Sequence, residues 1–181
     1  MMRYLIIIFC FLLNSASANK KENIINNLKE TKNINFDFEQ NINKKIEKGN
    51  CVIEYPKKIF CEYSGSNNKI LVSNGNSLVI KTSASYYLYP LEKTPLNLIL
   101  DKDYLINKIY NLEERVIDDS FINYKINENG SEINIFFDNQ SFNLIGWQTK
   151  DVYQNLNITF LSSVKRNESI NKSLFKLPLR N

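Results

Sequence analysis

Residues 86–100 read YYLYPLEKTPLNLIL, and this stretch decides how the rest of the chain is arranged. It starts as an aromatic strand, which Pro90 ends because proline has no N–H to donate to a neighbouring strand. Thr94 and Pro95 then predict the start of a helix, since threonine is a good cap and proline is favoured in the first turn. The next residues are almost all apolar, so we expect a short helix lying across the mouth of a curved sheet.

The segments on either side of this stretch have the spacing of β-strands. Between Asn33 and Ile42, apolar and polar residues alternate, which is typical of a strand with one buried face. Asn74-Gly75 and Asn129-Gly130 predict tight turns because both residue types tolerate positive φ. Short strands joined by turns at regular intervals predict a mainly β fold with some α, an antiparallel sandwich or barrel. The absence of strand–helix alternation disfavours a parallel α/β fold.

Three further segments have recognisable patterns. Residues 19–32 place Ile24, Ile25 and Leu28 on one side, which predicts an amphipathic helix closing one end of the sheet. Residues 103–111 predict a second short helix, and residues 175–177 a last strand.

Residues 1–18 have the composition of a secretory signal peptide. Arg3 gives a positive start, an apolar run follows, and Ala16-Ser17-Ala18 fits a cleavage site. A membrane anchor is the alternative, but the apolar run is far shorter than the roughly 20 residues of a spanning helix. We therefore expect cleavage after Ala18, export to the periplasm, and a single domain over residues 19–181.

Charge and composition argue against several classes of function. The net charge is +4 with no block of like charge, so nucleic-acid binding is not indicated. The sequence has no histidine, no Gly-rich phosphate loop and no nucleophile elbow, so we expect neither an enzyme nor a cofactor or metal site. We expect a monomer.

Two cysteines, Cys51 and Cys61, lie on either side of a predicted hairpin centred on Pro56. An oxidising compartment would let them pair across the hairpin. A disulfide closing this loop would contribute about 2–4 kcal/mol. Two buried free thiols are the alternative.

Apolar residues are spread over both the predicted sheet and the predicted helices. An ordinary core, filled between the two, is one interpretation. A single curved sheet with a few small helices on its concave side packs poorly across its full width, however. That arrangement predicts a gap lined by aliphatic and aromatic side chains, of the kind that holds a lipid.

Several motifs together resemble the periplasmic outer-membrane lipoprotein carrier proteins of the LolA family. The resemblance covers nearly all of the chain after residue 18. The motifs, in order, are Gly49, Tyr55-Pro56 and Glu62-Tyr63 in the hairpin, residues 70–75 (ILVSNG) with Leu78, Thr94-Pro95-Leu96, residues 156–160 (LNITF) and residues 173–178 (SLFKLP).

This resemblance implies a fold and an activity. The fold is an incomplete, half-open antiparallel β-barrel of about 10–11 strands with a lid of short helices over an apolar cavity. The activity is to bind the acyl chains of lipoproteins released by an inner-membrane ABC-type release complex and to carry them to an outer-membrane receptor. Such a carrier shelters hydrocarbon from water at about 0.8 kcal/mol per CH₂.

The resemblance and the face pattern also nominate site residues. The resemblance places Ile59 and Cys61 on the lipid-facing side of the hairpin, and Leu96 and Ile99 on the lid helix. The face pattern adds Leu28, Phe36, Phe38 and Ile53 to the predicted lipid-binding cavity.

The predicted gate of this cavity consists of Tyr55, Pro56 and Pro95. The family usually has an arginine immediately before the hairpin proline, associated with hydrogen bonds that hold the lid shut. Tyr55 stands there in this chain and can donate one hydrogen bond but not a charged fork. A second departure is Cys61, where a large aromatic residue is common. The sequence therefore leaves open how the lid is held.

Two other functions remain compatible with the pattern. One is a lipid- or lipoprotein-sensing periplasmic module without a transport role, for which a further domain after Leu177 would be expected. The other is a structural cell-surface β-protein, which predicts a filled core and no binding of a hydrophobic probe.

Overall fold

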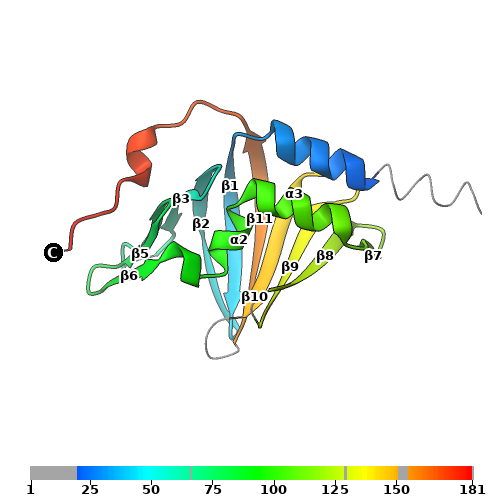
Figure 1. Cartoon of the computed structure of the whole chain (residues 1–181). Coiled ribbons are helices and arrows are strands. Elements are labelled where there is room, and N and C mark those ends of the chain that lie inside the picture. Colours follow the sequence, from blue (N-terminus) through cyan, green and yellow to red (C-terminus); the bar gives the residue numbers. More distant parts are fainter. Residues whose placement is uncertain (1–19, 66, 129, 151–154, 181) are drawn as a thin grey trace, which may run out of the picture.

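The computed structural model describes residues 20–65, 67–128, 130–150 and 155–180. The predicted signal peptide, its cleavage site after Ala18, and Asn129 lie outside these residues. The described residues form one antiparallel sheet of eleven strands in the order β6–β5–β4–β3–β2–β1–β11–β10–β9–β8–β7 (Figure 1). Among them, β6 and β7 are the two edges and do not pair with each other, so the sheet is an open barrel. The predicted fold class is confirmed.

The strands lie in the segments for which the sequence predicts them, and alternation of burial is clearest in β1. The bounds are β1 (Asn33–Ile42), β2 (Lys45–Glu54), β3 (Lys58–Tyr63), β4 (Ile70–Asn74), β5 (Ser77–Lys81), β6 (Tyr86–Pro90), β7 (Arg115–Ile117), β8 (Phe121–Glu128), β9 (Ser131–Asp138), β10 (Leu144–Lys150) and β11 (Leu156–Arg166).

The sheet consists of two meanders joined at its centre. β1 to β6 pair in chain order, as do β7 to β11, and β1 then pairs with β11 from Ile42↔Asn157 to Ile34↔Arg166. The register of this pair shifts between Asn35 and Asp37, an irregularity of the kind that bends a strand and increases its twist. Because β6 and β7 are opposite edges, the chain between them must cross the sheet.

The segment that makes this crossing is helical. It contains η1 (Leu91–Lys93), α2 (Leu96–Ile99) and α3 (Lys102–Asn111), and lies in front of the sheet in Figure 1. We call residues 91–112 the helical connector. Its apolar side faces the sheet, with five fully buried side chains: Leu91, Ile99, Leu100, Leu105 and Ile109.

The start of α2 differs from the prediction. Pro95 is the N-cap residue and no side chain caps the helix. The Thr94 hydroxyl instead donates to the Leu91 carbonyl oxygen at 2.8 Å. Such a local side-chain-to-backbone bond competes with capping, and here it closes the preceding 3₁₀ turn. The prediction that Thr94 caps this helix is therefore wrong, whereas the predicted helix over residues 103–111 is found as α3, capped by the Asp101 side chain.

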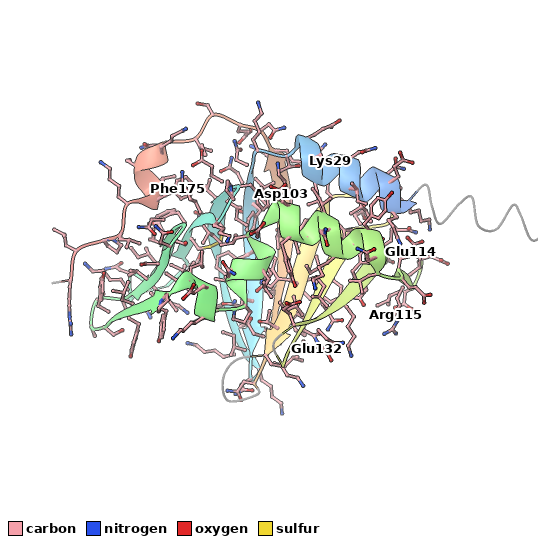
Figure 2. The ribbon with its side chains drawn as sticks, viewed as in Figure 1. Lys29, Asp103, Glu114, Arg115, Glu132 and Phe175 are labelled. Atoms are coloured by element: carbon pink, nitrogen blue, oxygen red, sulfur yellow. A yellow bond between two sulfur atoms is a disulfide. The ribbon has the colours of Figure 1, made fainter. Side chains whose placement is uncertain are left out.

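The predicted last strand, residues 175–177, is also wrong. Phe175 instead ends the 3₁₀ turn η2 (Lys172–Phe175), which packs beside β3 and β4, and residues 176–177 belong to no strand. The Asn171 side chain accepts a hydrogen bond from the Ser173 N–H at 3.0 Å and so begins the turn. Phe175, labelled in Figure 2, is 4% exposed, so its apolar side chain is buried from a turn and not from a strand.

A helix over residues 20–30 closes one end of the sheet, as predicted (Figure 1). Ile24, Ile25 and Leu28 are buried in the central hydrophobic cluster. The helix is also bound to the helical connector, because Lys21 Nζ donates to the Leu112 carbonyl at 2.7 Å. From the connector, Lys102 Nζ donates to the Thr31 carbonyl at 3.0 Å.

Candidate functional site

A cavity of about 230 Å³ lies between α2 and the inner face of the sheet. Its walls come from strands on both sides of the β1–β11 junction, which shows that the sheet curves around it. The helical connector contributes Thr94, Pro95, Leu96 and Ile99. The strands and the loop before β4 contribute Phe38, Gln40, Ile42, Cys51, Ile59, Cys61, Tyr63, Lys69, Leu71, Leu78, Ile80, Trp147, Thr149, Lys150, Asn157 and Thr159.

One part of the cavity is an apolar wall on β2 to β5. Cys61 pairs with Leu71, and Leu71 in turn pairs with Ile80, so their side chains share the inner face. Ile59 and Leu78 extend the same face, and both are buried. Leu96 and Ile99 cover this wall from the helical connector. A surface of this kind offers contacts to hydrocarbon and none to a charged ligand.

Phe38, on β1, borders this wall through a close approach that only glycine permits. Its ring packs edge-to-face on Tyr63, with ring centroids 4.9 Å apart. The Phe38 ring and the Tyr63 backbone lie against Gly49, where a Cβ would come within 2.1 Å of the Glu62 carbonyl oxygen and 2.8 Å of the Phe38 ring. A side chain at this position would push the ring out of place, so the glycine of the hairpin motif shapes the cavity.

The other part of the cavity is polar. The Tyr63 hydroxyl donates to Gln40 Oε1 at 3.2 Å, and Gln40 Nε2 donates to Thr159 Oγ1 at 3.2 Å. Lys69 Nζ lies 4.0 Å from the centre of the Tyr63 ring and pairs with Glu47. The cavity therefore has an apolar part beneath α2 and a polar part on β1, β3, β10 and β11.

Glu47 holds two lysines at this polar end. Its carboxylate accepts hydrogen bonds from Lys45 Nζ at 2.8 Å and from Lys69 Nζ at 2.5 Å. Burial alone would raise the pKa of Glu47, but these hydrogen bonds and the two positive charges outweigh it and hold the pKa below its ordinary value. Glu47 is therefore charged at neutral pH.

The helical connector is fastened to the β2–β3 hairpin through Lys57. The Lys57 backbone N–H donates to the Leu100 carbonyl at 2.8 Å, and Lys57 Nζ lies 3.2 Å from Asp101 Oδ2. A second attachment joins α3 to β8, where Glu128 accepts from Lys108 Nζ at 2.7 Å and from the Tyr104 hydroxyl at 3.0 Å. Burial, together with the Glu128 bond, raises the pKa of Tyr104 to about 12.

Tyr55, the residue in the predicted gate position, makes no such attachment. Its hydroxyl is buried and has no hydrogen-bond partner among the described residues, and burial raises its pKa. It belongs to a different, much smaller cavity of about 20 Å³ that Leu28 and Ile34 also line. The contact between the hairpin turn and the helical connector thus comes from Lys57, two positions after Tyr55.

The cavity collects some of the residues that the sequence nominates and not others. Phe38, Ile59, Cys61, Pro95, Leu96 and Ile99 line it. Leu28, Phe36 and Ile53 do not; they are buried in the surrounding core. Tyr55 and Pro56 belong to the hairpin turn outside the lining. A disulfide joins Cys51 to Cys61 across β2 and β3, and both cysteines line the cavity.

Sequence reasoning missed most of the lining. Leu71, Leu78 and Ile80 flank the Asn74-Gly75 turn, and the register of that hairpin gives a signal that could have found them. Thr149 and Thr159 are buried polar residues within strands, and Lys69 directly precedes β4; these are the local signs of a polar end. Nothing in the sequence shows that these residues meet, because they are brought together by pairing between strands that are far apart in the chain.

Other kinds of site are not found in the part of the chain that the structure describes. None of its His, Cys, Asp and Glu residues form a group of three or more that could hold a metal ion. None of its helices combines the length and apolarity needed to cross a membrane.

Solved structures with a similar fold share little sequence with this chain. A LolA superfamily protein from Nitrosomonas europaea is 6% identical, with a TM-score of 0.45, over 89% of this chain and 97% of the other. LprF from Mycobacterium bovis is 12% identical, with a TM-score of 0.45, over 86% and 97%. The MucA/MucB complex from Pseudomonas aeruginosa gives 7% identity and a TM-score of 0.51, over 90% of this chain and 61% of the matched chain.

Comparison with curated protein sequences found no match. A family model, described as outer membrane lipoprotein carrier protein LolA, matches residues 29–178. That range includes the whole sheet, the helical connector and every residue of the cavity lining. The chain therefore belongs to the LolA family of outer membrane lipoprotein carrier proteins.

Proposed function

We propose that this protein is a periplasmic carrier that shelters the acyl chains of lipoproteins on their way to the outer membrane. The observation that carries the proposal is the apolar wall beneath α2, roofed by the segment that joins the two unpaired edges of the sheet. A dozen methylenes left in water would cost about 10 kcal/mol, at about 0.8 kcal/mol for each. A soluble carrier has to offset that cost.

The size of the cavity supports the proposal that the helical connector moves as a lid. At about 230 Å³ the cavity is smaller than the roughly 300–1,000 Å³ of common ligand pockets. Lipid loading therefore requires α2 to swing away from the sheet. The ion pairs that hold the connector are partly exposed: the side chains are 35% and 28% exposed in the Lys57–Asp101 pair and 35% and 29% exposed in the Lys108–Glu128 pair. Such pairs contribute about 0–1 kcal/mol, which suits a reversible closure.

The proposal includes the route and the partners. The protein is exported after cleavage following Ala18, works as a monomer and is not an enzyme. It receives acylated lipoproteins from an inner-membrane ABC-type release complex and passes them to an outer-membrane lipoprotein receptor. No cofactor is needed, since the transfer forms and breaks no covalent bond.

The test is transfer of a lipoprotein into solution. Protein purified after export is incubated with ATP and inner-membrane vesicles that carry a radiolabelled lipoprotein. We expect the label to appear in the soluble fraction, bound to the carrier. Serum albumin at equal concentration controls for non-specific extraction. Label that stays in the vesicles at every carrier concentration would count against transport.

A second candidate is a module that senses lipids or lipoproteins without carrying them. It is favoured by the fold shared with MucB, whose solved complex contains the protein MucA. This candidate predicts that the protein binds lipid in its cavity but delivers none of its bound lipoprotein to outer-membrane vesicles. The label would then remain in the soluble fraction.

A further inference from the structure

The charges in the cavity lining are all of one sign. Among the described residues that line the cavity, Lys69 and Lys150 are cationic and none is an aspartate or glutamate. The remaining polar groups there are neutral amides and hydroxyls. An acyl chain alone needs none of these groups, so the polar end calls for a ligand with a head group.

Strand register places these groups at one end of the sheet. Thr149 pairs with Asn157, and Asn157 pairs with Ile42 of β1. Gln40, two residues before Ile42 in β1, pairs with Thr159 of β11 on one side and with Glu47 of β2 on the other. Lys69 reaches the same level through its bond to Glu47, and Lys150 follows Thr149 directly.

Among the described residues, the local charge at this end is positive. Glu47 balances only one of its two partners, Lys45 and Lys69, so that cluster carries one excess positive charge. Near Lys150, Glu132 is already paired with Lys125, whose Nζ lies 2.6 Å from Glu132 Oε2. Figure 2 places Glu132 near the same end of the sheet. An anion that enters the cavity would therefore meet unbalanced positive charge beside buried hydroxyls.

Apart from the exposed Lys150, these groups are also partly withdrawn from water. The Lys69 side chain is 18% exposed, and Thr149 and Thr159 are 7% and 3% exposed. Hydrogen bonds to an anionic group are stronger than neutral ones, and removal from water increases the difference. The opposite part of the cavity, beneath Leu96 and Ile99, is apolar.

We propose that the cavity binds an anionic amphiphile with a single hydrocarbon chain, whose head group lies between Lys69 and Lys150 and whose chain follows the apolar wall beneath α2. A carboxylate or a phosphate monoester satisfies this chemistry. A single chain is the smallest lipid that the cavity of about 230 Å³ would have to admit once α2 moves aside. This inference rests on the proposed function, since it takes the cavity to be a lipid site.

The test compares ligands of equal chain length that differ only in head group. Displacement of a polarity-sensitive fluorescent probe is measured below the critical micelle concentration for hexadecanoate, 1-palmitoylglycerol 3-phosphate, hexadecanol and 1-palmitoylglycerol. We expect the two anions to bind about tenfold to a hundredfold more tightly than the two neutral lipids, the range given by charge-assisted hydrogen bonds. A difference between the two anions identifies the preferred head group.

Variants assign the preference to the two lysines. Lys69→Gln and Lys150→Gln should each reduce the ratio of anion to neutral affinity several-fold, and Lys69→Arg should preserve it. Lys165→Gln is the matched control, because Lys165 belongs to β11 but does not line the cavity. Lys150 is exposed, so its variant tests the head group without disturbing the fold.

The outcomes separate this inference from the proposed function. Equal affinity for charged and neutral ligands, with lipoprotein transfer intact, would overturn the head-group site alone. A preference that survives both glutamine variants would overturn it as well. Failure of every ligand to bind, together with no lipoprotein transfer, would overturn the proposed function too.

Discussion

At the scale of single residues, Lys57 is the side chain that fastens the helical connector to the hairpin. It supplies both a backbone hydrogen bond to Leu100 and an ion pair with Asp101. Tyr55 occupies the position that the family motif associates with holding the lid, yet its buried hydroxyl has no partner among the described residues. An unpaired buried hydroxyl costs free energy and does not hold anything closed.

The Tyr55→Phe variant tests whether the Tyr55 hydroxyl holds the connector or is only a buried group without a hydrogen bond. We expect it to raise the free energy of unfolding by about 1 kcal/mol, because it removes a buried polar group that lacks a hydrogen bond. Urea titration measures this change. Lys57→Met should instead leave stability within about 1 kcal/mol and accelerate hydrogen exchange in α2 and α3. A destabilised Tyr55→Phe protein with a loosened connector would show that the hydroxyl does hold the lid.

Glu47 gives the polar end of the cavity a defined dependence on pH. Its folded-state pKa lies below the ordinary value of 4.5, so the unfolded chain binds a proton more readily. The stabilisation is therefore complete above pH 4.5 and is lost as the pH falls through the lower folded value. Urea unfolding at a series of pH values measures this loss. Glu47→Gln should show a shallower decline below pH 4.5 than the unaltered protein; parallel curves would contradict the assignment.

At the scale of elements, the β2–β3 hairpin carries a disulfide between directly paired residues. Cys51 and Cys61 face each other in the register, so the bond fixes which side chains of the hairpin face the cavity. With a sequence separation of 10 between them, the bridge closes a short loop.

Loss of the bridge should destabilise the protein by about 2–4 kcal/mol. Cys51→Ser with Cys61→Ser, compared with the oxidised protein, measures the difference by urea unfolding. A thiol count on the unfolded exported protein, with and without reductant, is the direct check. The same count in both samples would rule out the bridge.

The connector helix α2 is tested by placing a charge where it faces the cavity. Leu96 is half-buried and lines the cavity, so Leu96→Glu should lower the affinity for a lipid probe at least tenfold while the protein still folds. Lys93→Glu, at an exposed position in the neighbouring η1 turn, is the control. Circular dichroism and probe binding are measured together. If the Leu96 variant fails to fold, Leu96 is an ordinary core residue and the connector is not a lid.

Elements that follow from a local sequence pattern could be predicted. Elements that depend on which of two possible contacts a side chain makes could not. The strands follow from alternation, and the helix over residues 20–30 follows from its single apolar side. The prediction that Thr94 caps α2 failed because its hydroxyl donates to the Leu91 carbonyl in the η1 turn. The prediction of a strand over residues 175–177 failed because a phenylalanine can be buried from a turn as well as from a strand.

The candidate site follows the same division. Ile59, Cys61 and Leu96 could be nominated because the hairpin and the connector have local signatures. Lys69, Thr149 and Thr159 meet only because β1 pairs with β11 and joins the two meanders. A contact between strands from opposite ends of the chain leaves no periodicity in either strand, so the polar end could not be predicted.

At the scale of the whole molecule, one topological fact organises the rest. The two edges of the sheet are consecutive in the chain, and the segment between them crosses the sheet and roofs the cavity. In the proposed function, this segment also has to move aside for the cavity to admit an acyl chain. Its apolar residues are held by burial on one side, while its polar attachments to the sheet are few.

The central claim is that an acyl chain lies beneath this segment, and site-specific photo-cross-linking tests it most directly. A photoreactive residue at position 96, on the roof of the cavity, should cross-link to the acyl chain of a radiolabelled lipoprotein. The same residue at Phe160, which is 50% exposed and outside the lining, should not. Cross-links at position 160 with none at position 96 would contradict the account.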